Sequence, residues 1–285
     1  MIEVDSLTYT YPHRTDPALE GIELNIPAGQ FCGIVGPNGA GKSTLCYALS
    51  GFIPHFYRGQ YKGRVVVEGR ELSSTPLGEL AGEVGLVFQN PFNQITGARY
   101  TVREEVAFGL ENLGVPRPEM AKRVEEVLSR MGLGGLADRS PYALSGGQQQ
   151  RLAIASILVM RPKVIVLDEP TSQLDPVGTQ EVFSALEELV RERDTTVILA
   201  GQKLEWLARF ADRVLFLDGG RLVADGPPRE VLAAPWIEDR GVQPTRYTVA
   251  ARKAQEGRLS AADQALPVTF EQAVEFFLWT FRSRT

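Results

Sequence analysis

The 285-residue sequence predicts an α/β fold in which helices cover a largely parallel sheet. Short apolar runs alternate along the chain with segments of helical periodicity, a pattern that favours parallel strands joined by helical crossovers. A glycine-rich segment, residues 36–43, joins one such run to one such helix. Residues from about 90 to 160 show helical periodicity without a convincing strand, which predicts an inserted helical subdomain.

Apolar runs predict strands at residues 2–8, 22–26, 31–35, 64–67, 84–88, 164–167, 197–200 and 214–217. Helical periodicity predicts helices at residues 42–51, 102–113, 119–131, 147–159, 177–193 and 204–210. The strands before the glycine-rich segment are expected to form an antiparallel flap. We expect one domain over residues 1–235 and a small C-terminal extension over residues 236–285, where the pattern weakens before an amphipathic segment at residues 269–282.

Net charge, the lengths of the apolar runs and the number of cysteines argue against several classes of protein. The net charge of −5 disfavours a general nucleic-acid binder, because the chain has no basic surplus to neutralise phosphates. No run of about eighteen apolar residues occurs and no basic start precedes an apolar stretch, so we expect neither a membrane-spanning helix nor a signal peptide. The two cysteines, Cys32 and Cys46, are expected to be reduced packing residues.

The glycine-rich segment fits the pattern G-x-x-x-x-G-K-[ST], after an apolar strand and at the start of a helix. Its glycines allow consecutive backbone N–H groups to face an anion, and the helix N-terminus adds partial positive charge. Lys42 is expected to reach the β- and γ-phosphates of a nucleotide, and the Ser43 hydroxyl to bind Mg²⁺. This predicted phosphate loop, with the residue after it, comprises Gly36, Pro37, Asn38, Gly39, Ala40, Gly41, Lys42, Ser43 and Thr44.

Two adjacent carboxylates, Asp168 and Glu169, follow the strand predicted at residues 164–167. Packing explains such a strand end poorly, because buried charges without partners are costly. Asp168 is expected to balance Mg²⁺, and Glu169 to polarise the water that attacks a phosphate. A solvated strand end before a turn at Pro170 is the alternative explanation.

Residues 144–151, with the sequence LSGGQQQR, resemble the signature loop of the ATP-binding cassette (ABC) family. The resemblance implies a P-loop NTPase (RecA-like) core, ATP and Mg²⁺ as ligands, and a second ABC ATPase subunit in a homodimer or heterodimer. In that family the loop faces the ATP held by the partner, which implies this role for Ser145, Gly146, Gly147 and Gln148. A helix N-cap at Ser145 would account for the same residues without a ligand.

Further positions match the family in order along the chain. Tyr11 resembles the aromatic residue that stacks on adenine, with Tyr9 as the neighbouring candidate and an exposed strand-end tyrosine as the alternative. Gln89 resembles the glutamine that contacts Mg²⁺ and the attacking water, although a polar turn residue would also fit. Residues 172–175 resemble the loop that crosses the dimer interface, and Asp175 also fits a helix N-cap.

Residues 84–94 and 101–114 resemble the energy-coupling-factor branch of this family, whose members import vitamins or cobalt and nickel ions. In that branch two ATPases lie beneath a transmembrane coupling protein, which here would contact the segment from Gln89 to Gln94, and a substrate-binding membrane subunit completes the complex. The resemblance implies a peripheral position on the cytoplasmic face of the membrane. It also implies that the C-terminal extension helps to pair the ATPases. The resemblance to the ABC family as a whole covers residues 1 to about 234, whereas the resemblance to this branch rests on the two segments named above.

Two positions depart from the family pattern. Gln202 occupies the place of a histidine that contacts the γ-phosphate, and the two histidines of the chain, His13 and His55, lie far upstream. Glutamine can donate an amide N–H but carries no charge, so the site is either fully competent or attenuated, and Lys203 is a neighbouring source of charge. Phe92 replaces an acidic residue that pairs with an arginine of the coupling protein, and it either makes an apolar contact there or packs in the core.

The sequence therefore predicts an ATPase that drives import across a membrane, with Glu169, Gln202 and Gln89 at the catalytic centre. One alternative is a soluble ABC ATPase that acts on ribosomes or DNA, although neither a second cassette nor a long coiled coil is present. The other is a catalytically attenuated nucleotide-binding subunit of a heterodimer, which Gln202 favours and Glu169 argues against.

Overall fold

The computed structural model describes residues 1–172, 174–191, 195–257 and 264–282 of the chain. Its central sheet has the strand order β10-β9-β3-β8-β7-β6, and every neighbouring pair is parallel except β10 and β9. The strands are β3 (Phe31–Val35), β6 (Val84–Val87), β7 (Val164–Asp168), β8 (Thr196–Ala200), β9 (Arg213–Asp218) and β10 (Arg221–Gly226). The predicted α/β fold with a largely parallel sheet is confirmed.

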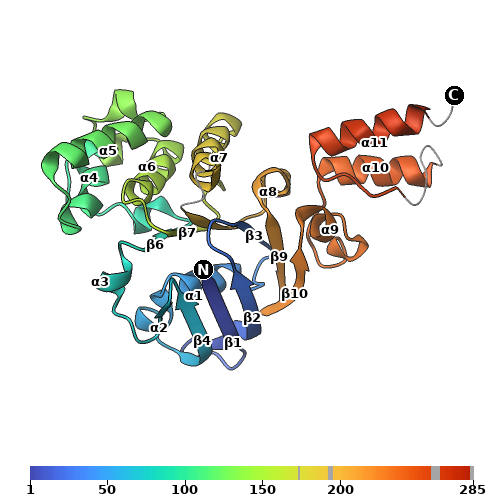
Figure 1. Ribbon diagram of the computed structural model, residues 1–285, viewed down its shortest axis with the longest axis horizontal. Coiled ribbons are helices and arrows are strands. Elements are labelled where there is room, and N and C mark those ends of the chain that lie inside the picture. The colour runs from blue at the N-terminus through green and yellow to red at the C-terminus, as the bar shows by residue number, and fades with distance from the viewer. Residues whose placement is uncertain (173, 192–194, 258–263, 283–285) are drawn as a thin grey trace.

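A second sheet is antiparallel and has the strand order β2-β1-β4-β5. It consists of β1 (Ile2–Thr10), β2 (Leu19–Ile26), β4 (Gln60–Val67) and β5 (Arg70–Glu71). In Figure 1 it lies beneath the central sheet, around the N-terminus. These strands confirm the predicted antiparallel flap and extend it by β5, which is too short to give a periodic pattern.

Helices cover the central sheet and project from both of its ends (Figure 1). Those before β6 are α1 (Lys42–Leu49), α2 (Phe52–His55) and α3 (Leu77–Leu80). Between β6 and β7 lie α4 (Val102–Asn112), α5 (Arg117–Arg130) and α6 (Gly146–Leu158), with the 3-10 turns η1 (Pro91–Asn93), η2 (Gly134–Leu136) and η3 (Pro141–Ala143). After β7 come α7 (Pro176–Arg191), α8 (Leu204–Phe210), α9 (Pro228–Leu232), η4 (Pro235–Ile237), α10 (Arg246–Glu256) and α11 (Phe270–Arg282).

The predicted helices agree with these elements to within one or two residues at most ends. Residues 90–160, all of them described, contain helices and turns but no strand. The predicted end of α7 at residue 193 lies outside the described residues. No helix in the described ranges is long and apolar enough to cross a bilayer.

Side chains of the central sheet alternate between two hydrophobic clusters, one on each face. In β3, Phe31 and Val35 join the cluster that includes residues of α4 to α9. Cys32 and Ile34 join the cluster formed with α1 and the antiparallel flap. Strands buried on both faces need apolar residues at consecutive positions, which explains why continuous apolar runs predicted them well. Both cysteines are free and buried, and burial raises the pKa of the Cys32 thiol to about 12.

The sequence pattern misses β10 and α10. β10 is an edge strand whose residues alternate between exposed and half-buried positions, so its apolar signal is weak. A two-residue turn at Gly219 and Gly220, both with positive φ, joins it to β9, and this glycine pair is a hairpin signal that the sequence does carry. α10 buries small residues, Ala251 and Ala254, against Phe276 of α11, which leaves it without a marked apolar stripe.

We predict that Gly85→Ala will lower the Tm by about 3–10 °C, through about 1–3 kcal/mol of lost stability. Gly85 lies in β6, and a Cβ added there would lie 2.3 Å from Cγ2 of Ile157 in α6. The β-branched Ile157 side chain has little rotamer freedom in a helix, so α6 itself would have to shift. Thermal unfolding of the purified variant measures the effect.

The matched control is Gly78→Ala in α3, where an added Cβ meets nothing within 4 Å. Its Tm should stay unchanged or rise slightly, because alanine favours a helix by about 1 kcal/mol over glycine. Equal Tm values for the two variants would contradict the close packing of α6 on β6.

Candidate functional site

The candidate site lies where the carboxyl ends of three neighbouring parallel strands meet. Ile34 of β3 and Asp168 of β7 are both in register with Ala200 of β8. The pairing continues one residue past the strand ends. Gly201 N donates to the Ile34 carbonyl at 3.1 Å, and Glu169 N donates to the Ala200 carbonyl at 2.9 Å. The strand pairing therefore brings three loops, distant in sequence, to one edge of the sheet.

A cavity of about 810 Å³ opens at this edge. Most of the residues expected to bind ligand line it, from the phosphate loop, the strand ends and the loop that follows β1. The lining residues are Tyr11, Arg14, Asp16, Ala18, Asn38, Gly39, Ala40, Gly41, Lys42, Ser43, Thr44, Gln89, Glu169 and Gln202.

The phosphate loop requires glycine at two of its positions for steric reasons. A Cβ at Gly36 would lie 2.1 Å from the Leu217 carbonyl oxygen, and one at Gly41 would lie 2.6 Å from the Ala18 carbonyl oxygen. Gly41 also has a φ of +100° and stands at the N-terminus of α1. Only glycine allows the backbone to pass this close to its neighbours and turn into the helix.

Lys42 is the cation of this loop. Its side chain is 6% exposed, and Nζ donates hydrogen bonds to the carbonyls of Gly36 (2.9 Å) and Pro37 (3.0 Å). Both partners are neutral, so they orient the ammonium without cancelling its charge. The first turn of α1 thus combines exposed backbone donors with one positive side chain, which suits a polyphosphate.

Asp168 and Glu169 have different environments although they are adjacent. Asp168 is 1% exposed and accepts a hydrogen bond from Ser43 Oγ at 3.0 Å. Burial raises the pKa of its carboxyl, an effect that the Ser43 hydrogen bond opposes and the neighbouring Glu169 charge strengthens. Glu169 is half-buried and has a φ of +46°, a conformation that costs a non-glycine residue about 1–3 kcal/mol. In this backbone conformation the Glu169 side chain lines the cavity.

Two amide groups hold the Glu169 carboxylate. Gln89 Nε2 donates to Oε2 at 3.0 Å, and Gln202 Nε2 donates to Oε1 at 3.1 Å. Gln202 Nε2 also lies 3.0 Å from Asn38 Oδ1 of the phosphate loop. Glu169, Gln89 and Gln202, which are expected to form the catalytic centre, therefore lie within one hydrogen-bond network.

Lys203 does not share this network. Its Nζ donates to Thr179 Oγ1 at 2.7 Å and to the Leu174 carbonyl at 3.4 Å, which ties it to the start of α7. Burial lowers the pKa of its ammonium. In this structure Lys203 is therefore engaged away from the cavity, and Gln202 stands alone in the place of the missing histidine.

Tyr11 lines the cavity, whereas Tyr9 does not. Tyr11 is half-buried, and its hydroxyl lies 3.2 Å from Thr44 Oγ1. Tyr9 is fully buried and donates to the Tyr57 carbonyl at 3.1 Å, so its ring cannot stack on a ligand. The two rings meet edge to face with centroids 4.9 Å apart, an arrangement in which Tyr9 supports Tyr11.

The four residues of the signature-like loop lie elsewhere, at the N-terminus of α6. Ser145 is its N-cap: its Oγ accepts from Gln148 N at 3.4 Å, and its N–H donates to Gln148 Oε1 at 3.0 Å. Gly146 and Gly147 form the first turn. Ser145 therefore caps α6, and none of these four residues lines the cavity of this chain.

Two more segments were singled out by the sequence. Phe92, in η1, is 59% exposed, so the core-packing interpretation of Phe92 is wrong. In the loop at residues 172–175, Asp175 Oδ1 accepts from Gly178 N at 2.7 Å, which supports an N-cap role, while Gln173 lies outside the described residues.

Sequence reasoning missed Arg14, Asp16 and Ala18, which line the cavity from the loop between β1 and β2. No motif marks them. Their proximity to Tyr11 in sequence is the one signal that could have indicated this loop.

The chain is similar to known proteins in both sequence and structure. A family model described as ABC transporter matches residues 19–172, more than half of the chain, including the phosphate loop, the signature-like loop and both carboxylates. The chain belongs to the ABC transporter family. It is an ATP-binding subunit and an ATPase of that family.

Relatives of this ABC ATPase extend over most of its length. A protein of Pyrococcus horikoshii named as an ABC transporter ATP-binding protein is 42% identical over 99% of this chain and 98% of its own length. The energy-coupling factor transporter ATP-binding protein EcfA1 of Lacticaseibacillus paracasei is 45% identical over 82% of this chain and 81% of its own.

Solved structures of ABC ATPases show the same fold. One is cbiO1 of Clostridium perfringens, described as part of the ABC transporter complex cbiONQ, with 35% identity, a TM-score of 0.71 and coverage of 90% of this chain and 94% of that one. Another is a dimeric ATP-binding cassette in a post-hydrolysis state with ADP and Pi, with 30% identity, a TM-score of 0.69 and coverage of 80% and 99%.

We predict that Lys42→Ala will weaken ATP binding by about two orders of magnitude, since it removes the charged donor of the phosphate loop. Equilibrium titration of the purified variant measures this. Lys253→Ala, on the exposed side of α10, is the control and should bind as the wild type does. Unchanged affinity in Lys42→Ala would show that the phosphates bind elsewhere.

Proposed function

We propose that this chain is the ATP-hydrolysing subunit of an importer of the energy-coupling-factor type, bound peripherally to the cytoplasmic face of a membrane. The similarity to EcfA1 and to cbiO1 supports the type of transporter. The observation that carries the catalytic part is Glu169, whose backbone has a positive φ and whose carboxylate is held by two amides beside the phosphate loop. The imported substrate, a vitamin or a transition-metal ion in this proposal, binds to a membrane subunit.

In the proposed ATP complex, the triphosphate lies on the backbone N–H groups of residues 36–44, and Lys42 turns from its carbonyl partners to the β- and γ-phosphates. Adenine stacks on the half-buried ring of Tyr11. Thr44, hydrogen-bonded to Tyr11, holds that ring at the start of α1.

The residues present fit a magnesium ion. Ser43 Oγ, a carboxylate oxygen of Asp168 and the amide oxygen of Gln89 are hard oxygen donors, which Mg²⁺ prefers. Among the described residues no group of three acidic, histidine or cysteine side chains forms a metal cage. Mg²⁺ is usually bound through one or two carboxylates, and phosphate oxygens and water fill its remaining positions. Bound Mg²⁺ would neutralise charge on the β- and γ-phosphates.

In the proposed hydrolysis, Glu169, Gln89 and Gln202 each have a different role. Glu169 accepts a proton from the attacking water, while the amides of Gln89 and Gln202 orient its carboxylate. Gln202, already in contact with Asn38 of the phosphate loop, donates an N–H toward the γ-phosphate in place of an imidazole. Asp168 is held by Ser43 below them.

The signature-like loop completes the site of a second ABC ATPase, in a homodimer or a heterodimer. Ser145, Gly146 and Gly147 present a capped helix N-terminus that lines no part of this chain's own cavity. Such a terminus suits an anion supplied from outside. The dimeric relative with ADP and Pi supports pairing of cassettes.

A transmembrane coupling protein is proposed to contact the segment from Gln89 to Gln94. The exposed ring of Phe92 offers an apolar contact there, instead of an ion pair. Gln150 Nε2 donates to the Phe88 carbonyl at 3.4 Å, so α6 is bonded to the residue that precedes Gln89. Movement of α6 on dimer closure would thereby reach the coupling segment.

We predict that Glu169→Gln will bind ATP but lower kcat by about 10²–10⁴-fold, because an amide cannot accept a proton from water. The trapped ATP should hold the variant as a dimer, whereas the wild type should return to monomer as ATP is consumed. Turnover assays and size-exclusion chromatography with ATP measure both effects. Wild-type turnover in this variant would rule out Glu169 as the base.

A catalytically attenuated subunit is the second candidate function, and Gln202 is the observation that favours it. If the site is attenuated, Gln202→His should raise homodimer kcat by about tenfold or more, because imidazole adds a donor that can carry charge near pH 7. Steady-state hydrolysis at saturating ATP, measured for the wild-type and Gln202→His homodimers, distinguishes the two possibilities. Equal rates, or a fall in the variant, would mean that glutamine already provides a fully competent site.

A further inference from the structure

A second cavity, of about 460 Å³, lies at the amino ends of the central strands, whereas the nucleotide site lies at their carboxyl ends. Lys163 and Thr195, which line it, directly precede β7 and β8, so the cavity opens at the amino ends of these strands. Its other walls come from α5, from the end of α6 and from α7. The cavity therefore joins the helices inserted between β6 and β7 to the sheet that carries the ATP site.

The lining of this cavity is strongly basic, although the chain as a whole carries a net charge of −5. Among its described residues, Arg123, Arg130, Arg161 and Lys163 face a single carboxylate, Glu126. Its floor is apolar and is formed by Val127, Leu158, Val159 and Ala185.

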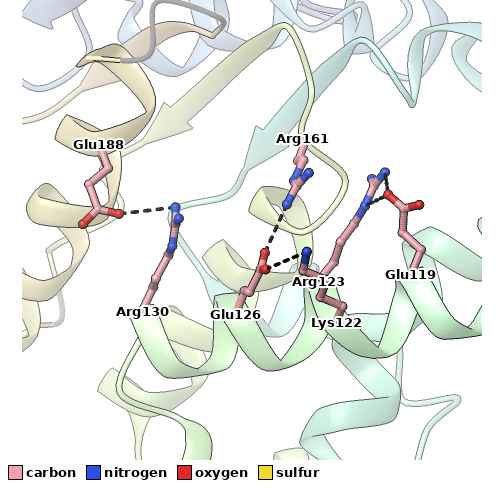
Figure 2. A network of polar contacts seen from close by, with 7 residues as sticks. All are labelled: Glu119, Lys122, Arg123, Glu126, Arg130, Arg161 and Glu188. Atoms are coloured by element: carbon pink, nitrogen blue, oxygen red, sulfur yellow. Dashed lines mark hydrogen bonds and ion pairs between the residues drawn. The ribbon is translucent and has the colours of Figure 1, made fainter.

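Three of these cations make ion pairs with acidic neighbours, as Figure 2 shows. Arg123 pairs with Glu119, Arg130 lies 3.3 Å from Glu188 of α7, and Arg161 lies 3.1 Å from Glu126. Glu126 is shared, since Lys122 lies 4.0 Å from it as well. Lys163 forms no ion pair with any residue in the described ranges. Positive charge is therefore in excess around the cavity.

The existing ion pairs are weak enough to be exchanged for a ligand. The side chains of Arg130 and Glu188 are 46% and 55% exposed, and those of Arg161 and Glu126 are 58% and 40% exposed. Solvent-exposed pairs of this kind contribute about 0–1 kcal/mol. An anion that meets several guanidinium groups at once forms stronger, charge-assisted hydrogen bonds.

The backbone at Arg161 gives independent support. Arg161 follows α6 with a φ of +55°, in the left-handed region where glycine or asparagine normally ends a helix. An arginine in that conformation costs about 1–2 kcal/mol. The backbone therefore places an arginine, at some cost, where glycine or asparagine is usual, and its side chain lines the cavity.

We propose that this cavity binds a small molecule that carries several anionic oxygens, either phosphates or carboxylates. Guanidinium groups bind both chemistries through paired hydrogen bonds, and Lys163 adds a point charge. The apolar floor would hold the carbon skeleton of the ligand. The bound anion would link α5, through Arg123 and Arg130, to the amino end of β7, through Arg161 and Lys163. If the proposed function holds, it would also bias how the inserted helices move during the ATP cycle.

Binding can be tested without ATP turnover in a Lys42→Ala background, in which the phosphate loop should compete for the probe far more weakly. Tripolyphosphate and citrate are titrated separately into the full chain in magnesium-free buffer at constant ionic strength. Saturable binding of either probe is expected, and the tighter one identifies the ligand class. Adding Arg130→Gln should weaken binding about tenfold or more, the effect of losing one charged hydrogen bond.

Arg103→Gln is the matched control, because Arg103 of α4 is 44% exposed and pairs with Glu125 at 2.8 Å but does not line the cavity. It should leave the affinity unchanged. Lys163→Gln, compared with Lys253→Gln, provides a second pair. Hydrogen exchange locates the site, since the bound probe should slow exchange in α5 and at the start of β7. No saturable binding of either probe, equal losses in Arg130→Gln and Arg103→Gln, or protection confined to other segments would overturn the proposal.

Discussion

The parallel pairing of β3 with β8 and of β8 with β7 determines where the phosphate loop, the two carboxylates and Gln202 lie. Their register aligns Ile34, Ala200 and Asp168 across three strands, so the phosphate loop, Glu169 and Gln202 leave the sheet at neighbouring points. Backbone hydrogen bonds from Gly201 to Ile34 and from Glu169 to Ala200 continue the pairing past the strand ends. Apolar side chains on both faces of the sheet fix this register, because a slipped strand would place its side chains on the wrong faces.

That arrangement accounts for the electrostatics of the site. Two carboxylates lie next to each other at the end of β7, and burial raises the pKa of the Asp168 carboxyl. Ser43 donates to Asp168, and the amides of Gln89 and Gln202 donate to Glu169, so all three donors are neutral. Lys42 instead donates to carbonyl groups of its own loop. Negative charge is thus gathered beside a positive loop without a direct ion pair between them. Such a site suits a ligand that brings both phosphates and a dication.

The sequence predicts those parts of the molecule that depend on local pattern. The phosphate loop is recognisable because its glycines are required by the backbone itself, and the buried strands because they are apolar at successive positions. The contacts of Glu169 with Gln89 and Gln202, and the basic cavity around Arg130 and Arg161, join residues distant in the chain, so no local pattern reveals them. The hydrogen bond from Lys203 to Thr179 likewise depends on how α7 packs beside β8.

In the proposed dimer, each ATP is hydrolysed between the phosphate loop of one cassette and the capped α6 terminus of another. Mixing two inactive variants, Lys42→Ala and Ser145→Arg, tests it directly. In a mixed dimer, the intact phosphate loop of the Ser145→Arg chain would face the intact α6 terminus of the Lys42→Ala chain, which restores one complete site. We expect negligible turnover from either variant alone and clear ATP hydrolysis from the mixture. A mixture as inactive as its components, or full turnover by Ser145→Arg alone, would contradict it.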